Sequence, residues 1–173
     1  MPDGDQSDDR LRPMVNQDLS AVLVWRNHPD VGSFMFNQAE ITPQEHQQWF
    51  KRTSMEEGRH LLIFECDGRP RGFVNVHMRA ADRIADWGFY VAPDAVRGTG
   101  RRLGDTALNY TFSFLEAHKL CARALAYNRK SIKFHLALGF QQEGVLRDQH
   151  FDGHGYHDVA CFGLLSGEWH RSK

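Results

Sequence analysis

The sequence has no apolar run close to the ~18 residues that a membrane-spanning helix needs, and residues 1–10 contain no apolar stretch like that of an export signal. We therefore expect neither membrane insertion nor export. The formal net charge is only -1, so the chain has no general electrostatic reason to bind nucleic acid or an anionic membrane. The expected partner is a small molecule, with no nucleic acid and no membrane involved.

Cysteine is scarce: the three residues, Cys66, Cys121 and Cys161, are far apart, odd in number, and lie in apolar segments. This pattern predicts reduced core thiols and not a disulfide framework, which indicates a reducing compartment, the cytoplasm. Repeats and low-complexity segments are also absent. We expect residues 1–10, which are rich in aspartate, to form a disordered tail and residues 11–173 to form a single domain.

Hydrophobic periodicity predicts interspersed helices and strands. Helices are predicted at residues 17–27, at 43–55, after a glycine-rich segment at 97–104, and at 129–138. Strands are predicted at residues 60–66, 72–78, 84–91, 120–127, 145–151 and 156–165. Residues 30–40 are expected to be a loop, and Gly88 is a candidate bulge or point of close backbone approach. The order of elements predicts an α/β (α+β) fold, a mixed sheet flanked by helices.

A glycine-rich turn, Arg97-Gly98-Thr99-Gly100-Arg101-Arg102, follows a predicted strand and opens a helix. Unpaired N–H groups and the positive end of the helix dipole make such a position suitable for phosphate, and glycine lets the backbone come close. The three arginines add charge suited to a pyrophosphate or a ribose 3'-phosphate. A P-loop is excluded because no Gly-Lys-Ser/Thr follows, and Leu103 replaces the third glycine of a dinucleotide-binding G-x-G-x-x-G. The alternative is a structural turn with solvated arginines.

This turn resembles the R/Q-x-x-G-x-G/A segment with which the GNAT superfamily of acetyltransferases cradles the pyrophosphate of coenzyme A (CoA). Arg102 replaces the last small residue of that segment, so its side chain is expected to point away from the cofactor. Residues 128–140 resemble the superfamily's N-x-x-[SA]-I-x-x-Y-x-x-x-G-F motif, which lines the pantetheine and thiol end. The resemblance implies a GNAT fold: a central, mixed, mostly antiparallel twisted sheet of about seven strands flanked by about four helices.

The same resemblance implies a cofactor and a reaction. Acetyl-CoA would give its acetyl group to an amine and leave as CoA, with no metal required. Strands 84–91 and 120–127 are expected to splay apart, so that the thioester lies between them and a free N–H near residues 89–91 holds its carbonyl. The residues that the resemblance implies in cofactor binding are Phe89, Tyr90, Val91, Arg97, Gly98, Thr99, Gly100, Arg101, Arg102, Leu103, Asn128 and Ser131.

Three residues are candidates for proton transfer. His135 stands where the superfamily often has a tyrosine that protonates the leaving thiolate; histidine is able to take that role, but a packing role is equally open. Asp86 and His77 are candidates for the base, and a one-residue register error would exchange the strand faces on which they lie. A buried water is an equally good base, and a surface or ion-paired carboxylate is the ordinary role for Asp86. Asn128 either bonds the cofactor or caps the helix that follows it.

The N-terminal half is expected to bind the acceptor amine. Residues 25–27, 34–38 and 45–46 resemble the acetyltransferases of pseudaminic acid synthesis, which acetylate the 4-amine of a UDP-linked amino sugar. Residues 143–147 and 156–159 also fit that subgroup. The residues implied in substrate binding are Arg26, Met35, Phe36, Asn37 and His46.

Physical chemistry supports some of these roles and offers ordinary alternatives. Arg26 is suited to a diphosphate, Met35 or Phe36 to the face of the uracil ring, and His46 to a phosphate or hydroxyl. The alternatives are that Met35 and Phe36 belong to the core and that Arg26 pairs with a nearby acid.

Other functions also fit parts of the sequence. Ribosomal-protein N-terminal acetyltransferases share some of these segments. A polyamine acceptor is a further alternative, although the loop after the first helix offers only Asp30 and Glu40 as acidic residues. A non-catalytic acyl-CoA-binding module is an alternative of another class.

Three histidines, His150, His154 and His157, lie close together in sequence near a predicted hairpin turn. No cysteine or carboxylate completes a regular ligand set, so solvated turn residues are expected and no metal is predicted. A homodimer is compatible with the resemblance, and the sequence does not fix the oligomeric state.

Overall fold

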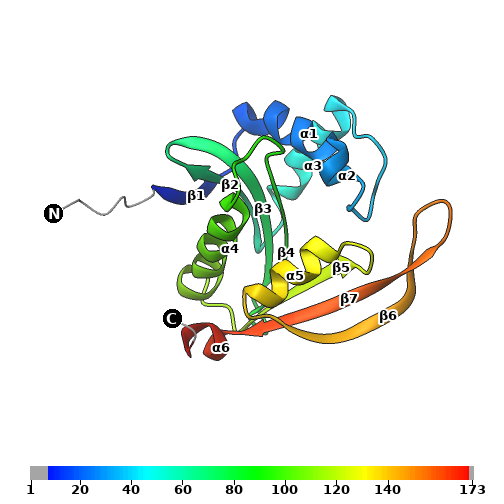
Figure 1. Ribbon diagram of the computed structural model, residues 1–173. Helices are drawn as coiled ribbons and strands as arrows, with labels where there is room; N and C mark the ends of the chain where they lie inside the picture. The colour runs from blue at the N-terminus through cyan, green and yellow to red at the C-terminus, as the bar shows by residue number, and fades with distance from the viewer. Residues whose placement is uncertain (1–7, 172–173) are drawn as a thin grey trace.

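The computed structural model describes residues 8–171, which form a seven-stranded sheet with helices on both faces (Figure 1). The strands lie in the order β1-β2-β3-β4-β5-β7-β6, and neighbours are antiparallel except for β4 and β5, which are parallel. The strands are β1 (Asp9–Pro13), β2 (Arg59–Cys66), β3 (Arg69–Arg79), β4 (Ile84–Val91), β5 (Lys119–Leu125), β6 (Gln141–Phe151) and β7 (Tyr156–Leu165). The predicted mixed, mostly antiparallel sheet is confirmed.

The sheet is the middle layer of three. The helices are η1 (Asn16–Asp18), α1 (Leu19–Asn27), α2 (Pro29–Gly32), α3 (Pro43–Thr53), α4 (Thr99–Asn109), its π-helical continuation η2 (Tyr110–Phe114), α5 (Arg129–Ala137) and α6 (Ser166–Arg171). One core, which includes Val76, Leu103 and Leu120, joins the sheet to α4 and α5. A second core, which includes Val22 and Ile63, joins the other face to α1 and α3. Within the described residues, no helix is long and apolar enough to cross a membrane.

Most predicted elements form, with ends that differ by a few residues. Strands β4 and β7 have the predicted bounds. Helix α3 begins at Pro43, as predicted, because Thr42 and Glu45 form the reciprocal hydrogen bonds of a capping box. Helix α6 was not predicted.

The structure corrects part of two predictions, those for the loop at residues 30–40 and for a bulge at Gly88. The start of the predicted loop forms the helical turn α2, because Pro29 takes the first helical position and the His28 side chain accepts a hydrogen bond from the Asp30 N–H. Gly88 makes no bulge, since β3 and β4 pair through it without a shift in register. The extended backbone is thus continuous past this glycine.

Regular structure begins earlier than residue 11, the expected start of the domain. Asp9 belongs to β1, inside the segment predicted to be a tail, because its carboxylate binds the Arg102 side chain of α4. Residues 1–7, the rest of that predicted tail, lie outside the described residues.

Two glycines let α4 lie close to its neighbours. A Cβ on Gly72 of β3 would lie 2.4 Å from Cδ1 of Leu103, and a Cβ on Gly104 would lie 2.8 Å from Cζ of Phe134 on α5. Interiors are close-packed, so a methyl group at either position would force these elements apart. The glycines therefore fix α4 against both the sheet and α5.

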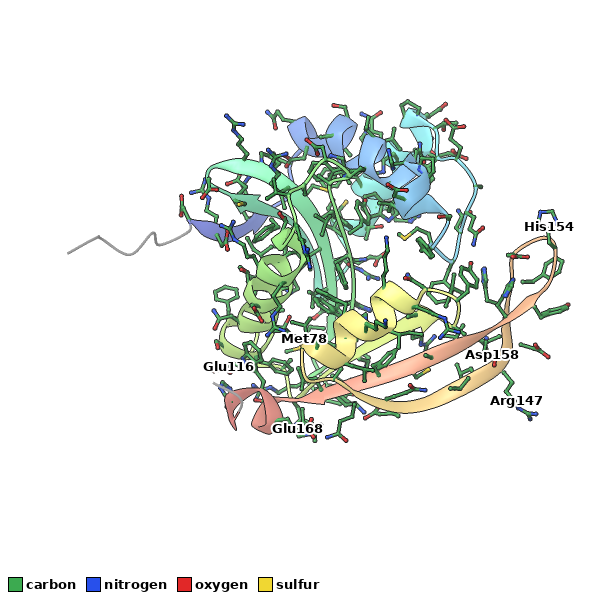
Figure 2. All side chains as sticks on the ribbon, in the orientation of Figure 1. Met78, Glu116, Arg147, His154, Asp158 and Glu168 are labelled. Carbon is green, nitrogen blue, oxygen red and sulfur yellow. The ribbon has the colours of Figure 1, made fainter. Side chains whose placement is uncertain are left out.

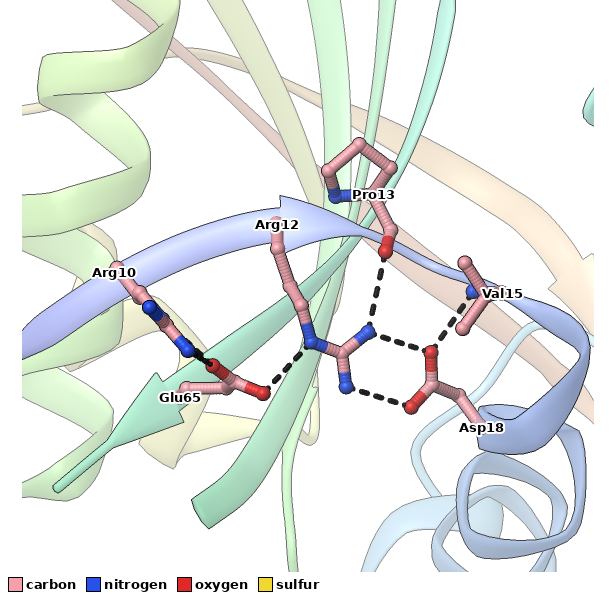
Figure 3. A network of polar contacts seen from close by, with 6 residues as sticks. All are labelled: Arg10, Arg12, Pro13, Val15, Asp18 and Glu65. Carbon is pink, nitrogen blue, oxygen red and sulfur yellow. Dashed lines mark hydrogen bonds and ion pairs between the residues drawn. The ribbon is translucent and has the colours of Figure 1, made fainter. Parts of the chain in front are cut away.

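Charged side chains tie β1 to the adjoining elements (Figure 3). Arg12 donates two hydrogen bonds to Asp18, of 2.7 and 2.8 Å, and one of 2.7 Å to Glu65, which also accepts one from Arg10. Hydrogen bonds from Arg12 and then Arg10 hold the pKa of Glu65 below its usual range. Burial raises the pKa of Asp18, but hydrogen bonds from Arg12 and the Val15 N–H outweigh it, and the net pKa is lowered. Both carboxylates are therefore ionised partners of Arg12.

Candidate active site

Strands β4 and β5 separate midway along their length (Figure 1). They pair only from Ile84 to Asp86 on β4, and the last pair joins Asp86 to Cys121. Beyond that pair the strands diverge, which confirms the predicted splay. The gap belongs to a cleft of about 1390 Å³, lined by residues of both strands, of α1, α3 and α5, and of the segment between α2 and α3.

The second half of β4 directs backbone donors into this gap. The Ala92 N–H donates to the Arg71 carbonyl of β3, and the hydrogen-bonding direction alternates along a strand. The Tyr90 N–H therefore also faces β3, whereas the N–H groups of Phe89 and Val91 face the side from which β5 has diverged. Two donors are thus available in the region where the sequence predicted a contact to a carbonyl.

Helix α4 begins beside the end of β4. Gly98, its N-cap, has a φ of 96°, a left-handed conformation that glycine adopts without steric cost. Gly100 lines the cleft, and a Cβ there would lie 3.7 Å from its nearest neighbour. Arg97 is exposed beside this turn. The turn therefore combines helix-start N–H groups, room for close approach and an exposed guanidinium, which together suit a pyrophosphate.

The other two arginines of the turn are directed elsewhere. Arg102 binds Asp9 through hydrogen bonds of 2.6 and 2.7 Å, which agrees with the expectation that its side chain points away from the cofactor. Arg101 binds Asp105 at 2.9 Å and the Ala137 carbonyl of α5 at 2.7 Å. In this structure nearby acceptors hold both guanidinium groups, so Arg97 is the arginine of the turn that is left exposed for a phosphate.

Thr99 and Leu103 also turn their side chains away from the cleft. The Thr99 hydroxyl donates to the Val96 carbonyl at 2.8 Å, and Leu103 is fully buried against the sheet. Only the main chain of these two residues is left to contact a cofactor.

Asn128 caps α5. Its Oδ1 accepts a hydrogen bond of 3.1 Å from the Ser131 N–H, which is one of the two roles that the sequence offered for it. Both residues line the cleft. The cap therefore places the first turn of α5 beside the gap between β4 and β5.

His135 is 2% exposed and surrounded by aromatic rings. It stacks on Phe162 with 5.3 Å between ring centroids, and Trp87 and Phe140 meet it edge to face at 5.7 and 5.2 Å. Its Nδ1 lies 2.7 Å from the Ser131 carbonyl, which can only accept, so we assign the proton to Nδ1. Burial lowers the pKa of the imidazole. The favoured form is therefore neutral, with no proton on Nε2 to donate.

Asp86 and His77 are cross-strand partners on the sheet face toward α1 and α3. Asp86 is exposed, lines the cleft, and lies in the last pair before the strands diverge. Asn75, on the same face of β3, also lines the cleft, but His77 does not. The geometry thus favours Asp86 over His77 as a base.

Two buried polar side chains lie in the cleft wall on the helical side. Arg26 is 7% exposed, and its guanidinium donates to the Asn37 carbonyl. Burial lowers its pKa, but a guanidinium stays charged, and it has no ion pair with any carboxylate of residues 8–171. His46 is 4% exposed and stacks on Trp49 with 5.1 Å between ring centroids. Its Nε2 atom has no hydrogen-bond partner among residues 8–171. Pairing of Arg26 with a nearby acid, the ordinary alternative, is not observed.

Met35, Phe36 and Asn37 all line the cleft from the segment between α2 and α3. Met35 packs against the second core, whereas Phe36 is 48% exposed and meets the His150 ring edge to face at 5.5 Å. The side chain of Asn37 accepts a hydrogen bond from the Ala39 N–H. A core role therefore describes Met35 in part and Phe36 not at all.

The three histidines of the β6–β7 hairpin do not converge. His157 pairs with Asp152 at 2.7 Å, His150 lies against Phe36, and His154 is at the tip of the hairpin, away from the body of the protein (Figure 2). Their arrangement follows from the hairpin turn and gives no common centre.

Sequence reasoning missed Tyr127, just beyond β5. Its hydroxyl accepts a 2.7 Å hydrogen bond from Gln38 and donates to the Ser33 carbonyl at 3.4 Å. The contact with Gln38 joins positions 89 residues apart, so no local pattern indicates it.

A comparison with known families agrees with this geometry. The family described as "Acetyltransferase (GNAT) domain" matches residues 10–141. The chain belongs to the GNAT acetyltransferase family. This GNAT protein is therefore an N-acetyltransferase, as the resemblance of its two motifs implied.

Relatives of this GNAT acetyltransferase differ in name. Spermidine N(1)-acetyltransferase of Escherichia coli K12 is 26% identical over 144 residues, which cover 82% of this chain and 77% of the relative. Acetyltransferase PseH of Campylobacter jejuni is 28% identical over 123 residues, covering 69% and 74%. The crystal structure of Vibrio cholerae spermidine N-acetyltransferase with CoA and spermine has a TM-score of 0.86 over 93% of this chain and 97% of that one, at 22% identity. The last comparison shows a shared fold.

Proposed function

We propose that this enzyme acetylates a primary amine on a phosphate-bearing acceptor, the 4-amine of a UDP-linked amino sugar. The observation that carries the proposal is Arg26, whose charged guanidinium is buried in the cleft wall without a carboxylate partner among residues 8–171. A buried cation is costly unless an opposite charge reaches it, and a diphosphate offers that charge in a geometry that arginine matches. The similarity to PseH supports the same acceptor class.

Neighbouring side chains support a nucleotide as the carrier of the amine. The Nε2 atom of His46, on the same side of the cleft as Arg26, has no hydrogen-bond partner among the described residues. The exposed ring of Phe36 offers a flat apolar surface suited to uracil. Asn37 contributes to the same wall. These residues would hold the nucleotide on the α1–α3 side of the sheet.

The start of α4 fits the pyrophosphate of CoA. Gly98 and Gly100 permit close approach of the backbone, Arg97 is exposed beside them, and Asn128 and Ser131 line the path toward the gap. When bound, acetyl-CoA supplies the acetyl group as an activated thioester. Its phosphates at α4 would place the thioester between β4 and β5.

Residues at the gap would then perform the transfer. The N–H groups of Phe89 and Val91 would hold the acetyl carbonyl oxygen and would stabilise the negative charge that develops there. The amine nitrogen loses two protons between its ammonium form and the amide product. Asp86 takes one, directly or through a water, and the departing thiolate takes the other. His135, neutral and bonded to Ser131, packs the wall of the thiol pocket.

A polyamine is the second candidate acceptor. Its support is the similarity to spermidine acetyltransferases and the carboxylates of Asp30, Glu40, Glu45 and Asp86 in the cleft wall. The buried charge of Arg26 disfavours it, because like charges repel strongly where water is excluded. N-terminal acetylation of a ribosomal protein is a third acceptor to test.

The test compares kcat/KM for a UDP-4-amino sugar, spermidine and a ribosomal N-terminal peptide. We expect the nucleotide sugar to be used best, and Arg26→Gln to raise its KM by about 10- to 100-fold through loss of a charged contact, with the affinity for CoA unchanged. Arg52→Gln is the matched control, since Arg52 also lines the cleft but is exposed. Best turnover of spermidine, with a KM indifferent to Arg26→Gln, would show the acceptor assignment to be wrong.

A further inference from the structure

Residues 33–41, which we call the lid, lie between α2 and α3 and extend across the cleft toward β5 and the β6–β7 hairpin (Figure 1). The end of the lid next to α3 is anchored to α1. The Asn27 side chain donates to the Ile41 carbonyl at 2.8 Å and accepts from the Ile41 N–H at 3.0 Å, and Arg26 donates to the Asn37 carbonyl. This end is therefore fixed to the helical half of the molecule.

The rest of the lid is held from the opposite side of the cleft, by Tyr127. The Tyr127 hydroxyl accepts from Gln38 at 2.7 Å and donates to the Ser33 carbonyl at 3.4 Å, and its ring lies 6.2 Å from that of Phe34. The other edge of the Tyr127 ring meets His157 of β7 at 4.9 Å. Tyr127 thus joins the lid to the β5–β7 half of the sheet.

A second contact across the cleft opposes closure. Phe36 covers His150 of β6, and the Nε2 atom of this histidine is buried without a hydrogen-bond partner among the described residues. A buried polar atom without a partner is unfavourable, and it would regain water if the lid opened. The polar bonds of Tyr127 add to the apolar packing of Phe34 and Met35 in favouring the closed position.

We propose that Tyr127 is a positioning residue that holds the lid closed over the acceptor, and so controls acceptor binding. Its bonds to the lid are exposed and few, so opening of the lid to admit the acceptor breaks little more than these bonds and the packing of Met35 on the second core. Tyr127 itself lies outside the wall of the cleft, and Leu125 and Asn128 on either side of it line that wall. The role is independent of which amine is acetylated.

The experiment is a double-mutant cycle of Tyr127→Phe and Gln38→Ala on the full chain. Two readouts are used: amide hydrogen exchange of residues 33–41 in the free protein, and steady-state kinetics with whichever tested amine is turned over. We expect each single variant to speed exchange in the lid about 3- to 10-fold and to raise the acceptor KM by a similar factor, with kcat within twofold and CoA affinity unchanged. The double variant should be no worse than Tyr127→Phe alone, because that change already removes the bond to Gln38 together with the one to the Ser33 carbonyl.

Tyr156→Phe is the matched control, since this tyrosine is 67% exposed and its ring packs at a tilt on Phe151 within the hairpin. It should change neither readout. Unchanged lid exchange and unchanged acceptor KM in both single variants would overturn the proposal, as would fully additive effects in the cycle. Gln38 is exposed on the surface of the lid, so Gln38→Ala leaves both cores intact. The test can therefore be made with this variant even if Tyr127→Phe does not fold. The hydrogen-exchange measurement needs no acceptor. The proposal for the lid can therefore be refuted while the nucleotide-sugar assignment stands, and the nucleotide-sugar assignment can be refuted while the proposal for the lid stands.

Discussion

At the scale of single residues, the chemistry open to His135 depends on one hydrogen bond. The sequence places it where related enzymes often have an acid, but the Ser131 carbonyl 2.7 Å away fixes the proton on Nδ1. Donation from Nε2 would need the imidazolium ion, which burial among aromatic rings disfavours. A histidine at a solvent-exposed site could carry the second proton and act as an acid.

We therefore expect His135→Phe, which keeps an aromatic ring in the same shell, to lower kcat by less than about tenfold. Removal of a general acid costs about 100- to 10,000-fold. The pH profile of kcat separates the two roles, because loss of an acid also removes the fall in activity at high pH that marks its deprotonation. A loss above about 100-fold together with that change of profile would return His135 to an acid role. CoA affinity serves as the check that the variant is folded.

At the scale of elements, β1 is held by charge as well as by its pairing with β2. Its five residues are at the sheet edge, and Arg12 binds both Asp18 and Glu65 there (Figure 3). Both carboxylates are less than a tenth exposed, so loss of Arg12 would leave two nearly buried charges without their main partner. The attachment of this strand is therefore sensitive to pH.

The pKa values of Asp18 and Glu65 are lowered in the folded protein, so their contribution to stability is present above the unfolded values near pH 4 and is lost as pH falls through the folded values. We expect the free energy of unfolding, measured with urea, to fall as pH is lowered below about 5. Arg12→Gln should reduce it by about 1–3 kcal/mol at neutral pH and flatten this dependence.

The control for this prediction is Arg71→Gln, which removes the exposed pair with Asp94 and should cost at most about 1 kcal/mol. A wild-type stability that is independent of pH below 5, or equal effects of the two variants, would contradict a special role for Arg12.

At the scale of the whole molecule, the cofactor and acceptor regions meet where the sheet divides. Strands β3 and β4 with α1–α3 line one side of the cleft, and β5 with α5 lines the other. A ligand seated in the cleft contacts both sides at once. Binding of CoA should therefore stabilise the fold as a unit.

We expect CoA at about 100 times its Kd to raise the free energy of unfolding by about 2.7 kcal/mol, measured by urea or thermal unfolding. Gly98→Val should weaken CoA binding by at least about tenfold, because valine does not tolerate a φ of 96° and the turn must change shape. Gly68→Val is the matched control, since Gly68 has a φ of 70° in the β2–β3 turn, away from the cleft. Equal CoA affinity in both variants would show that the turn at the start of α4 does not bind the cofactor.

The sequence by itself determined most of the elements and the two motifs. Alternating and helical periodicities located the strands, the capping residues Thr42 and Glu45 located α3, and Asn128 located the start of α5. These signals are local, since they depend on neighbours within about four residues. Both motifs lie at helix starts and are recognised from such local signals. Their occurrence together, in the expected order along the chain, was enough to indicate the family.

Only the tertiary structure decided which side chains act together. Arg101 and Arg102 had the charge for a phosphate, but acceptors on α5 and β1 took their guanidinium groups. Arg26 is buried and has no carboxylate partner among the described residues. Tyr127 accepts a hydrogen bond from Gln38 of the lid, 89 positions away in the sequence. Such outcomes depend on which distant atoms arrive within about 3 Å, a quantity set by the packing of whole elements and not by residue type or spacing.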